Sequence, residues 1–152
     1  ILSGKESEES IMKYSLVKKG AALAVVAAVT LSAGNVALAG SHSGAFTIDR
    51  GNYVEVLKNG KVTKSNTSGS AAKFTCNMSV GYNDTLNFYV YNKNNNIVSA
   101  GPATFRGTSK GTQKTSPYRD GKGLKGNPFY FRCSLDLHSV SSSMKVNYKF
   151  IP

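Results

Sequence analysis

Apolar and polar residues alternate with a period of two along most of the chain after the first 40 residues. No apolar repeat of 3.6 residues reaches the length of a helix in that part. The clearest alternation lies in residues 143–151, where Met144, Val146, Tyr148 and Phe150 are separated by polar side chains. Such a pattern is typical of strands with one face on a core and one in water. It predicts an all-β domain.

Turn residues separate the alternating segments. Asn59-Gly60 predicts a type I′ hairpin between residues 53–58 and 61–65, and a Gly-Tyr-Asn-Asp turn predicts another between residues 71–80 and 85–92. Short strands with regular turn signals predict a single small antiparallel β-sandwich of about seven or eight strands. The remaining candidate segments are residues 45–49, 97–100, 103–107, 128–139 and 143–151.

Residues 12–39 have the three parts of a secretory signal peptide. A lysine-containing start precedes an apolar run over residues 21–31, and Ala37-Leu38-Ala39 forms a small-x-small cleavage site. The alternative, a membrane-spanning helix, needs about 20 apolar residues, roughly twice this run. Cleavage predicts a mature protein that begins at Gly40 and is secreted or associated with the cell surface.

Residues 1–11 precede Met12, where the signal peptide begins. We interpret them as translated leader or as sequence introduced in cloning, and exclude them from the fold. The predicted organisation is therefore a leader over residues 1–11, a signal peptide over residues 12–39 and one secreted domain over residues 40–152.

The two cysteines, Cys76 and Cys133, lie on the apolar faces of predicted strands. Export would place them where disulfides persist. We therefore predict a buried Cys76–Cys133 disulfide between strands that meet across the core. Two free buried thiols are the alternative.

The predicted mature domain is strongly basic. Of the 19 lysines and arginines four precede Gly40, and of the eight acidic residues three do, which leaves 15 against five. The irregular segment 107–127 is rich in glycine and contains one acid, Asp120. Clustered cations there suggest an anion-binding loop, although a basic loop is also commonly just solvated. The predicted anion-binding residues are Arg106, Lys110, Lys114, Arg119, Lys122 and Lys125.

Catalytic chemistry has little support in the sequence. The acidic residues of the mature domain are scattered, and no metal-ligand spacing or glycine-rich phosphate motif occurs. Asp136 and His138 alternate on one predicted strand and are interpreted as a polar face. We expect a non-enzymatic domain without cofactor or metal and without a specific nucleic-acid partner.

Tyrosines at alternate positions form a second candidate surface. An exposed tyrosine offers apolar area with a hydrogen-bonding tip, which suits sugars or partner proteins, although tyrosine is also an ordinary strand residue. The predicted aromatic surface consists of Tyr89, Tyr91, Tyr118 and Tyr130.

The signal peptide, the stretch LNFYVYNKNNNIVSAGPATFRG, a tyrosine-containing Gly/Ser loop and the ending VNYKFIP follow one another. In this order the chain resembles small secreted β-sandwich proteins of unknown function from Gram-positive bacteria. The resemblance implies an exported domain of one β-sandwich with no assigned activity. Lactococcin-type bacteriocins are similarly small and basic, but this chain has no tryptophan and lacks their characteristic start.

Two functions are therefore expected. The first is attachment to an anionic cell-envelope polymer or membrane surface through the basic segment. The alternative is a bacteriocin-like or toxin-like antimicrobial effector. The two differ in whether purified protein inhibits the growth of neighbouring strains.

Overall fold

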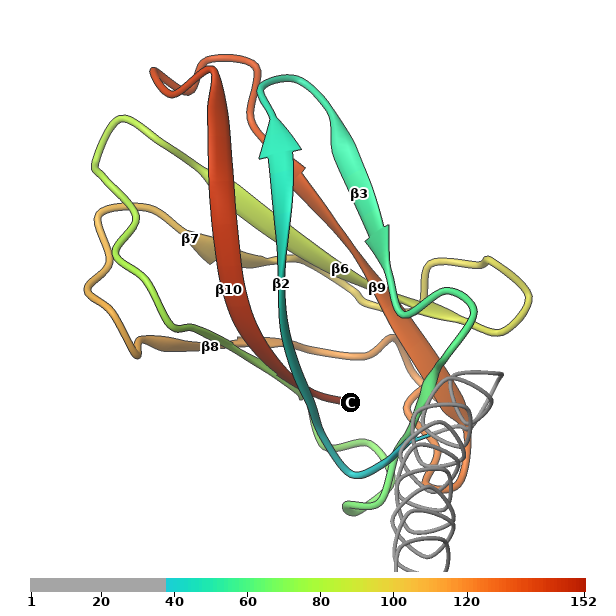
Figure 1. Cartoon of the computed structure of the whole chain (residues 1–152). Coiled ribbons are helices and arrows are strands. Elements are labelled where there is room, and N and C mark those ends of the chain that lie inside the picture. The colour runs from blue at the N-terminus through green and yellow to red at the C-terminus, as the bar shows by residue number, and fades with distance from the viewer. Residues whose placement is uncertain (1–37) are drawn as a thin grey trace, which may run out of the picture. The chain divides into compact units, whose positions relative to one another are not determined.

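The computed structural model describes residues 38–152. The predicted leader and the predicted signal peptide lie outside the described residues, apart from Leu38 and Ala39. The described part consists of strands and connections without a helix, which confirms the predicted all-β fold (Figure 1). Its strands are β1 (Leu38–Ala39), β2 (His42–Asp49), β3 (Tyr53–Val56), β4 (Val62–Thr63), β5 (Ala72–Cys76), β6 (Leu86–Asn92), β7 (Ala103–Phe105), β8 (Gln113–Ser116), β9 (Pro128–Leu135) and β10 (Ser143–Ile151).

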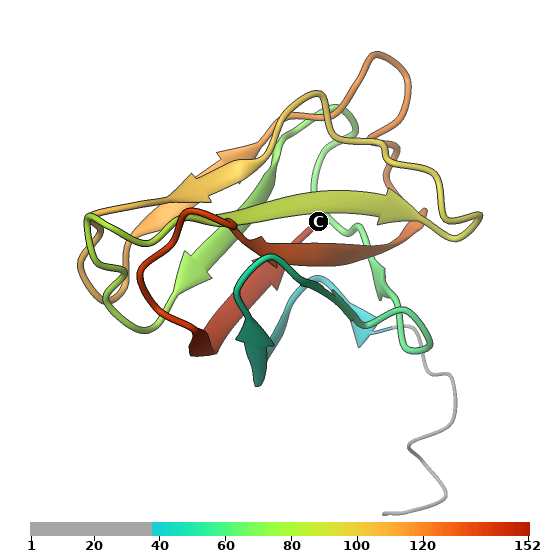
Figure 2. The same ribbon diagram turned by 90° about the horizontal axis from the view of Figure 1, so that it is seen from above.

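The strands form two sheets, and Figure 2 shows them as two layers. The first sheet has the order β1-β4-β9-β6-β7, and β3 also pairs with β9. The second sheet has the order β2-β10-β5-β8. Connections β2–β3, β5–β6, β7–β8 and β9–β10 cross between the sheets at one end, which we call the β9–β10 end. Connections β4–β5 and β8–β9 cross at the opposite end, which we call the β8–β9 end.

Aromatic rings fill the space between the sheets. Phe131 of β9 lies at their centre, and the ring centroid of Tyr148 in β10 stands 4.9 Å from it. The alternation predicted from the sequence is confirmed in β5, β6, β9 and β10, whose inward positions are buried except for the partly buried Met144. The other rings that contact Phe131 belong to Phe46, Phe74, Phe88 and Phe150.

The predicted hairpin around Asn59-Gly60 is wrong. β3 and β4 do not pair with each other, and both instead pair antiparallel with β9, one after the other along it. A type I′ turn needs positive φ at both central residues, whereas in this loop the positive φ lies at Leu57 (66°). The chain therefore leaves the sheet at Leu57 and rejoins the same edge of β9 at Val62.

The predicted hairpin between residues 71–80 and 85–92 is also wrong, because β5 belongs to the second sheet and β6 to the first. The β5–β6 connection is hydrogen-bonded to the β9–β10 connection. Asp84, which is 9% exposed, accepts hydrogen bonds from the backbone N–H (2.9 Å) and the hydroxyl (2.8 Å) of Ser141. A turn sequence therefore marks a crossing between layers here.

The predicted irregular segment 107–127 is more ordered than the sequence suggests. It contains β8, which pairs antiparallel with β5. Thr108 forms an isolated bridge with Val80, and Tyr118 forms one with Ser99. The segment is thus tied to β5 and to the connections that precede and follow β6 before it reaches β9.

Several predicted strands are shorter than expected, among them residues 71–80, of which β5 covers Ala72–Cys76. Residues 97–100 form only isolated bridges, at Ile97 and Ser99. β9 stops at Leu135, so Leu137, which the alternation assigned to the inward face, is 70% exposed. The apolar period therefore continues past the point where the strand ends.

Candidate functional site

The six predicted anion-binding residues do not form one site. Arg106 and Lys110 lie in the β7–β8 connection at the β9–β10 end, and Lys114 lies in β8 itself. The other three lie in the β8–β9 connection at the opposite end. The prediction of a single basic loop is therefore wrong, because β8 runs through the segment and separates its cations. The residues at the β8–β9 end are Arg119, Lys122 and Lys125.

Cations from other strands join this second group. Lys73 lies one residue after the start of β5 and pairs with Thr115 near the end of β8. Lys93 follows β6, whose last residue, Asn92, pairs with Phe129 at the start of β9. Both lysines therefore reach the β8–β9 end. We call the combined set the basic end: Lys73, Lys93, Arg119, Lys122 and Lys125.

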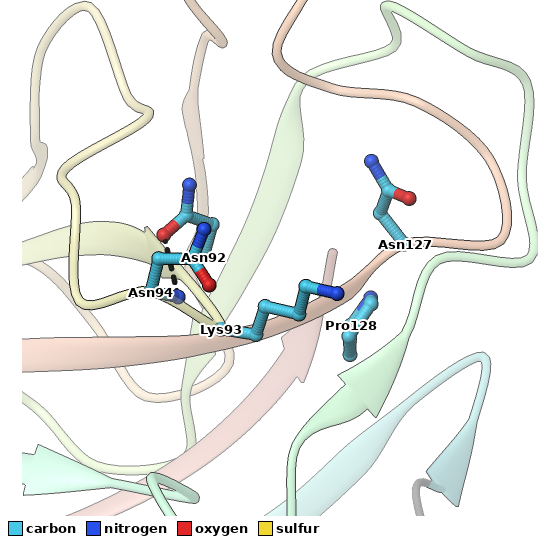
Figure 3. Close-up of a pocket in the computed structure, with 5 residues that line it drawn as sticks. All are labelled: Asn92, Lys93, Asn94, Asn127 and Pro128. Atoms are coloured by element: carbon cyan, nitrogen blue, oxygen red, sulfur yellow. Dashed lines mark hydrogen bonds between the residues drawn. The ribbon is translucent and has the colours of Figure 1, made fainter.

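A pocket of about 230 Å³ opens at the basic end (Figure 3). Figure 3 shows the Lys93 side chain extending across it toward Pro128, with the amide groups of Asn92 and Asn127 on either side. The Asn92 carboxamide oxygen accepts a hydrogen bond from the backbone N–H of Asn94 at 2.9 Å. This bond fixes the part of the pocket wall that the two residues form. One ammonium group among amides offers donors to an anionic group.

The basic end is held together by a buried lysine that sequence reasoning missed. Lys64 is 1% exposed, and its ammonium group donates to the carbonyl (2.8 Å) and hydroxyl (3.0 Å) of Ser70 and to the carbonyl of Pro152 (3.0 Å). It also lies 4.9 Å from the ring centroid of Tyr118. Burial lowers the pKa of Lys64. Lys64 lies two residues after the buried Val62, at a position where the alternation places an inward side chain. This is the sequence signal that could have identified it.

The exposed cations of the basic end lack acidic partners within the described residues. In residues 38–152, the carboxylate that pairs with lysine or arginine is Glu55, which contacts Lys58 and Arg132 at 2.6 Å each. Lys73, Arg119 and their neighbours therefore keep their charge available to a ligand. Unpaired surface cations attract polyanions by displacing condensed counterions.

The four predicted aromatic-surface residues have three different environments. Tyr89 and Tyr91 lie partly exposed on the outer face of the first sheet, as predicted. Tyr130 shares that face but is fully covered, since it stacks on Tyr91 (centroids 5.3 Å apart) and donates to Asn95 at 3.2 Å. Tyr118 is packed against Phe129 near Lys64, where burial raises its pKa. The prediction of an exposed side chain is therefore wrong for Tyr130, and Tyr118 is partly buried against the core.

The outer face of the first sheet instead centres on Arg132. Its guanidinium carbon lies 4.2 Å from the ring centroid of Tyr53 and 4.6 Å from that of Tyr91. Hydrogen bonds from Lys58, then from Arg132, lower the pKa of Glu55. Stacking and ion pairing together fix these side chains on the sheet.

The predicted disulfide is absent, and Cys76 and Cys133 are free buried thiols. They belong to different sheets, β5 in the second and β9 in the first. Both side chains pack in the hydrophobic core between the sheets. Burial raises the pKa of Cys76 to about 12 and also raises that of Cys133. Both thiols therefore resist ionisation.

Asp136 and His138 lie in the turn after β9 rather than on a strand. The Asp136 carboxylate accepts a hydrogen bond from the backbone N–H of His138 at 2.8 Å and contacts its Nδ1 at 3.1 Å. This contact lowers the pKa of Asp136, chiefly through the backbone bond. The arrangement is a turn contact between exposed side chains.

Within residues 38–152, no group of three or more histidine, cysteine, aspartate or glutamate side chains is arranged to hold a metal ion. The same residues contain no helix long and apolar enough to cross a membrane.

No model of a protein family matches the chain, and no curated protein matches it.

Proposed function

We propose that this protein is a non-enzymatic, exported binding domain that attaches to an anionic polymer of the cell envelope through its basic end. The observation that carries the proposal is the gathering of Lys73, Lys93 and three cations of the β8–β9 connection at one end, without carboxylate partners in the described residues. Binding would release counterions and weaken as salt rises.

The pocket supplies a place for one anionic group of the polymer. The Lys93 ammonium group and the Asn92 and Asn127 amides around it are donors for phosphate or carboxylate oxygens. The other cations of the basic end would hold neighbouring anionic groups of the polymer. A repeating anion such as a poly(glycerol phosphate) teichoic acid suits this arrangement, because each of its units carries one phosphate.

The test compares two triple charge reversals that change the net charge equally at different places. The first replaces Lys93, Lys122 and Lys125 with Glu, and the second replaces Arg106, Lys110 and Lys114 with Glu. The measurement is retention on immobilised poly(glycerol phosphate) teichoic acid over a range of salt, with uncharged dextran as the blank. We expect the first variant to lose tenfold or more in affinity and to show a shallower salt dependence, and the second to lose far less.

Equal losses in both variants would show that net charge alone governs retention and would refute a defined site. Unchanged retention in the first variant would refute attachment through the basic end. Circular dichroism and thermal unfolding check that both variants keep the fold, which we expect because all six side chains are exposed.

A further inference from the structure

The end of the sandwich opposite the basic end exposes large apolar side chains. Tyr82 is 79% exposed, and Leu137 and Val140 are each 70% exposed. Tyr82 lies in the β5–β6 connection and the other two lie in the β9–β10 connection. These are three of the five large hydrophobic side chains exposed in the described part, so their gathering at one end calls for an explanation.

Hydrogen bonds join the two connections. The backbone N–H of Val140 donates to the carbonyl of Asn83 at 3.1 Å, and that of Asp136 donates to Thr85 at 3.0 Å. The contacts between Asp84 and Ser141 reinforce this junction. Figure 1 shows both connections at the same end of the sandwich. We call Tyr82, Leu137 and Val140 the apolar tip.

Two arginines are bonded to the backbone of the same connections. Arg106 donates through Nε to the carbonyl of Tyr82 at 2.8 Å, and Arg50 donates through Nη1 to the carbonyl of Ser139 at 3.2 Å. A guanidinium group has five N–H donors, so each arginine keeps donors for a second partner. Their charges therefore lie beside the apolar tip.

We propose that the apolar tip inserts into the interfacial layer of a lipid bilayer, with Arg50 and Arg106 at the level of the headgroup phosphates. Tyrosine with an apolar body and polar tip, aliphatic side chains and flanking cations together suit a surface that is apolar inside and anionic outside. The proposal does not depend on the proposed function, which uses the opposite end of the domain.

A lipid surface fits this tip better than a protein partner does. A stable protein interface buries about 800 Å² on each partner, and three side chains from two connections cover much less. A bilayer needs only that the tip enters, because the lipid chains reshape around the inserted groups. The small size of the apolar tip is thus a reason to choose lipid as its occupant.

The test measures sedimentation with phosphatidylcholine vesicles, and with vesicles of equal parts phosphatidylcholine and phosphatidylglycerol. One variant combines Tyr82→Ser, Leu137→Ser and Val140→Ser. The control, Leu124→Ser, removes a hydrophobic side chain that is 48% exposed in the β8–β9 connection. We expect the triple variant to lose at least tenfold in partitioning to both kinds of vesicle and the control to match the parent. All proteins carry the same N-terminal residues, so any contribution of residues 21–31 is equal throughout.

A second measurement reports directly on insertion. Because Cys76 and Cys133 are buried, a cysteine introduced by Val140→Cys can be labelled selectively with an environment-sensitive dye, and Leu124→Cys serves as the control position. We expect a blue shift on vesicle addition at position 140 alone. Absence of vesicle binding by the parent protein, equal binding by the triple variant, or equal shifts at both positions would overturn the proposal. Loss of teichoic acid binding by the basic-end variant with vesicle binding intact would separate the two functions.

Discussion

The two ends of the sandwich are each secured by one buried charged side chain, of opposite sign. At the β8–β9 end the Lys64 ammonium group donates to three oxygens of Ser70 and Pro152. At the β9–β10 end the Asp84 carboxylate accepts two hydrogen bonds from Ser141. In both cases the charged group hydrogen-bonds to other parts of the chain. We call Lys64 and Asp84 the two anchors. The sign of an anchor's charge therefore does not determine the charge of the surface at its end of the sandwich.

What the ends expose follows from their connections. The basic end is built from the start of β5, the connection after β6 and the β8–β9 connection, whereas the apolar tip comes from the β5–β6 and β9–β10 connections. The strands fix which connections meet, and the connections supply the chemistry. One core can thus support two surfaces of different character.

The largest expected effect on stability is that of Lys64→Ala. It removes three hydrogen bonds from a charged donor and leaves buried carbonyls without a partner, which should cost about 3 kcal/mol of unfolding free energy. We expect the melting temperature to fall by roughly 10 °C or more. Urea denaturation gives the free energy, and Lys73→Ala at the exposed basic surface is the control. A loss no larger than the control's would contradict an anchoring role for Lys64.

A smaller loss is expected for Asp84→Ala, about 2 kcal/mol, because two hydrogen bonds are removed and the anchor is 9% exposed. Amide hydrogen exchange should increase at Val140 and Ser141 while the basic end stays protected. Asp120→Ala, an exposed acid in the β8–β9 connection, should change nothing. Faster exchange at both ends would show that the ends are not secured independently.

The smallest effect is expected between the ends, for Glu55→Gln on the outer face of the first sheet. The Glu55–Arg132 pair is partly exposed and should contribute less than about 1 kcal/mol. Because the pKa of Glu55 is lowered from its ordinary 4.5, its contribution is present above pH 4.5 and is lost as the pH falls through the lowered folded-state value. Thermal unfolding from pH 7 to pH 2 should show the parent and Glu55→Gln converging at the acid end. A constant difference across this range would contradict the assignment.

Most of the strands could be predicted from the alternation, but their pairing could not. β10 has the predicted bounds, and the inward positions of β5, β6 and β9 are those expected. Both predicted hairpins fail because a short turn sequence does not decide where the next strand pairs. After Asn59-Gly60 the chain continues along the same edge of β9, and after residues 81–84 it pairs in the other sheet. That choice depends on distant contacts, such as that of Asp84 with Ser141.

The candidate site could be predicted only in part, for the same reason. A segment rich in cations suggested anion binding, but β8 divides it, and Lys73 and Lys93 reach the basic end from elsewhere in the sequence. The alternation did contain an unused signal at both anchors, since Lys64 is in phase with Val62, and Asp84 with Leu86. It also misassigned Leu137, whose exposure became visible only once β9 was seen to end at Leu135.

The position of β10 in the second sheet has a consequence for the timing of folding. This strand, the last of those described, lies between β2, near the start of the domain, and β5. The second sheet therefore cannot assemble until residues 143–151 are available, and its formation must bring together segments about 100 residues apart in sequence. If residues 12–39 direct export, as the sequence predicts, the second sheet stays unfolded throughout translocation. It then forms only after the C-terminal strand has emerged.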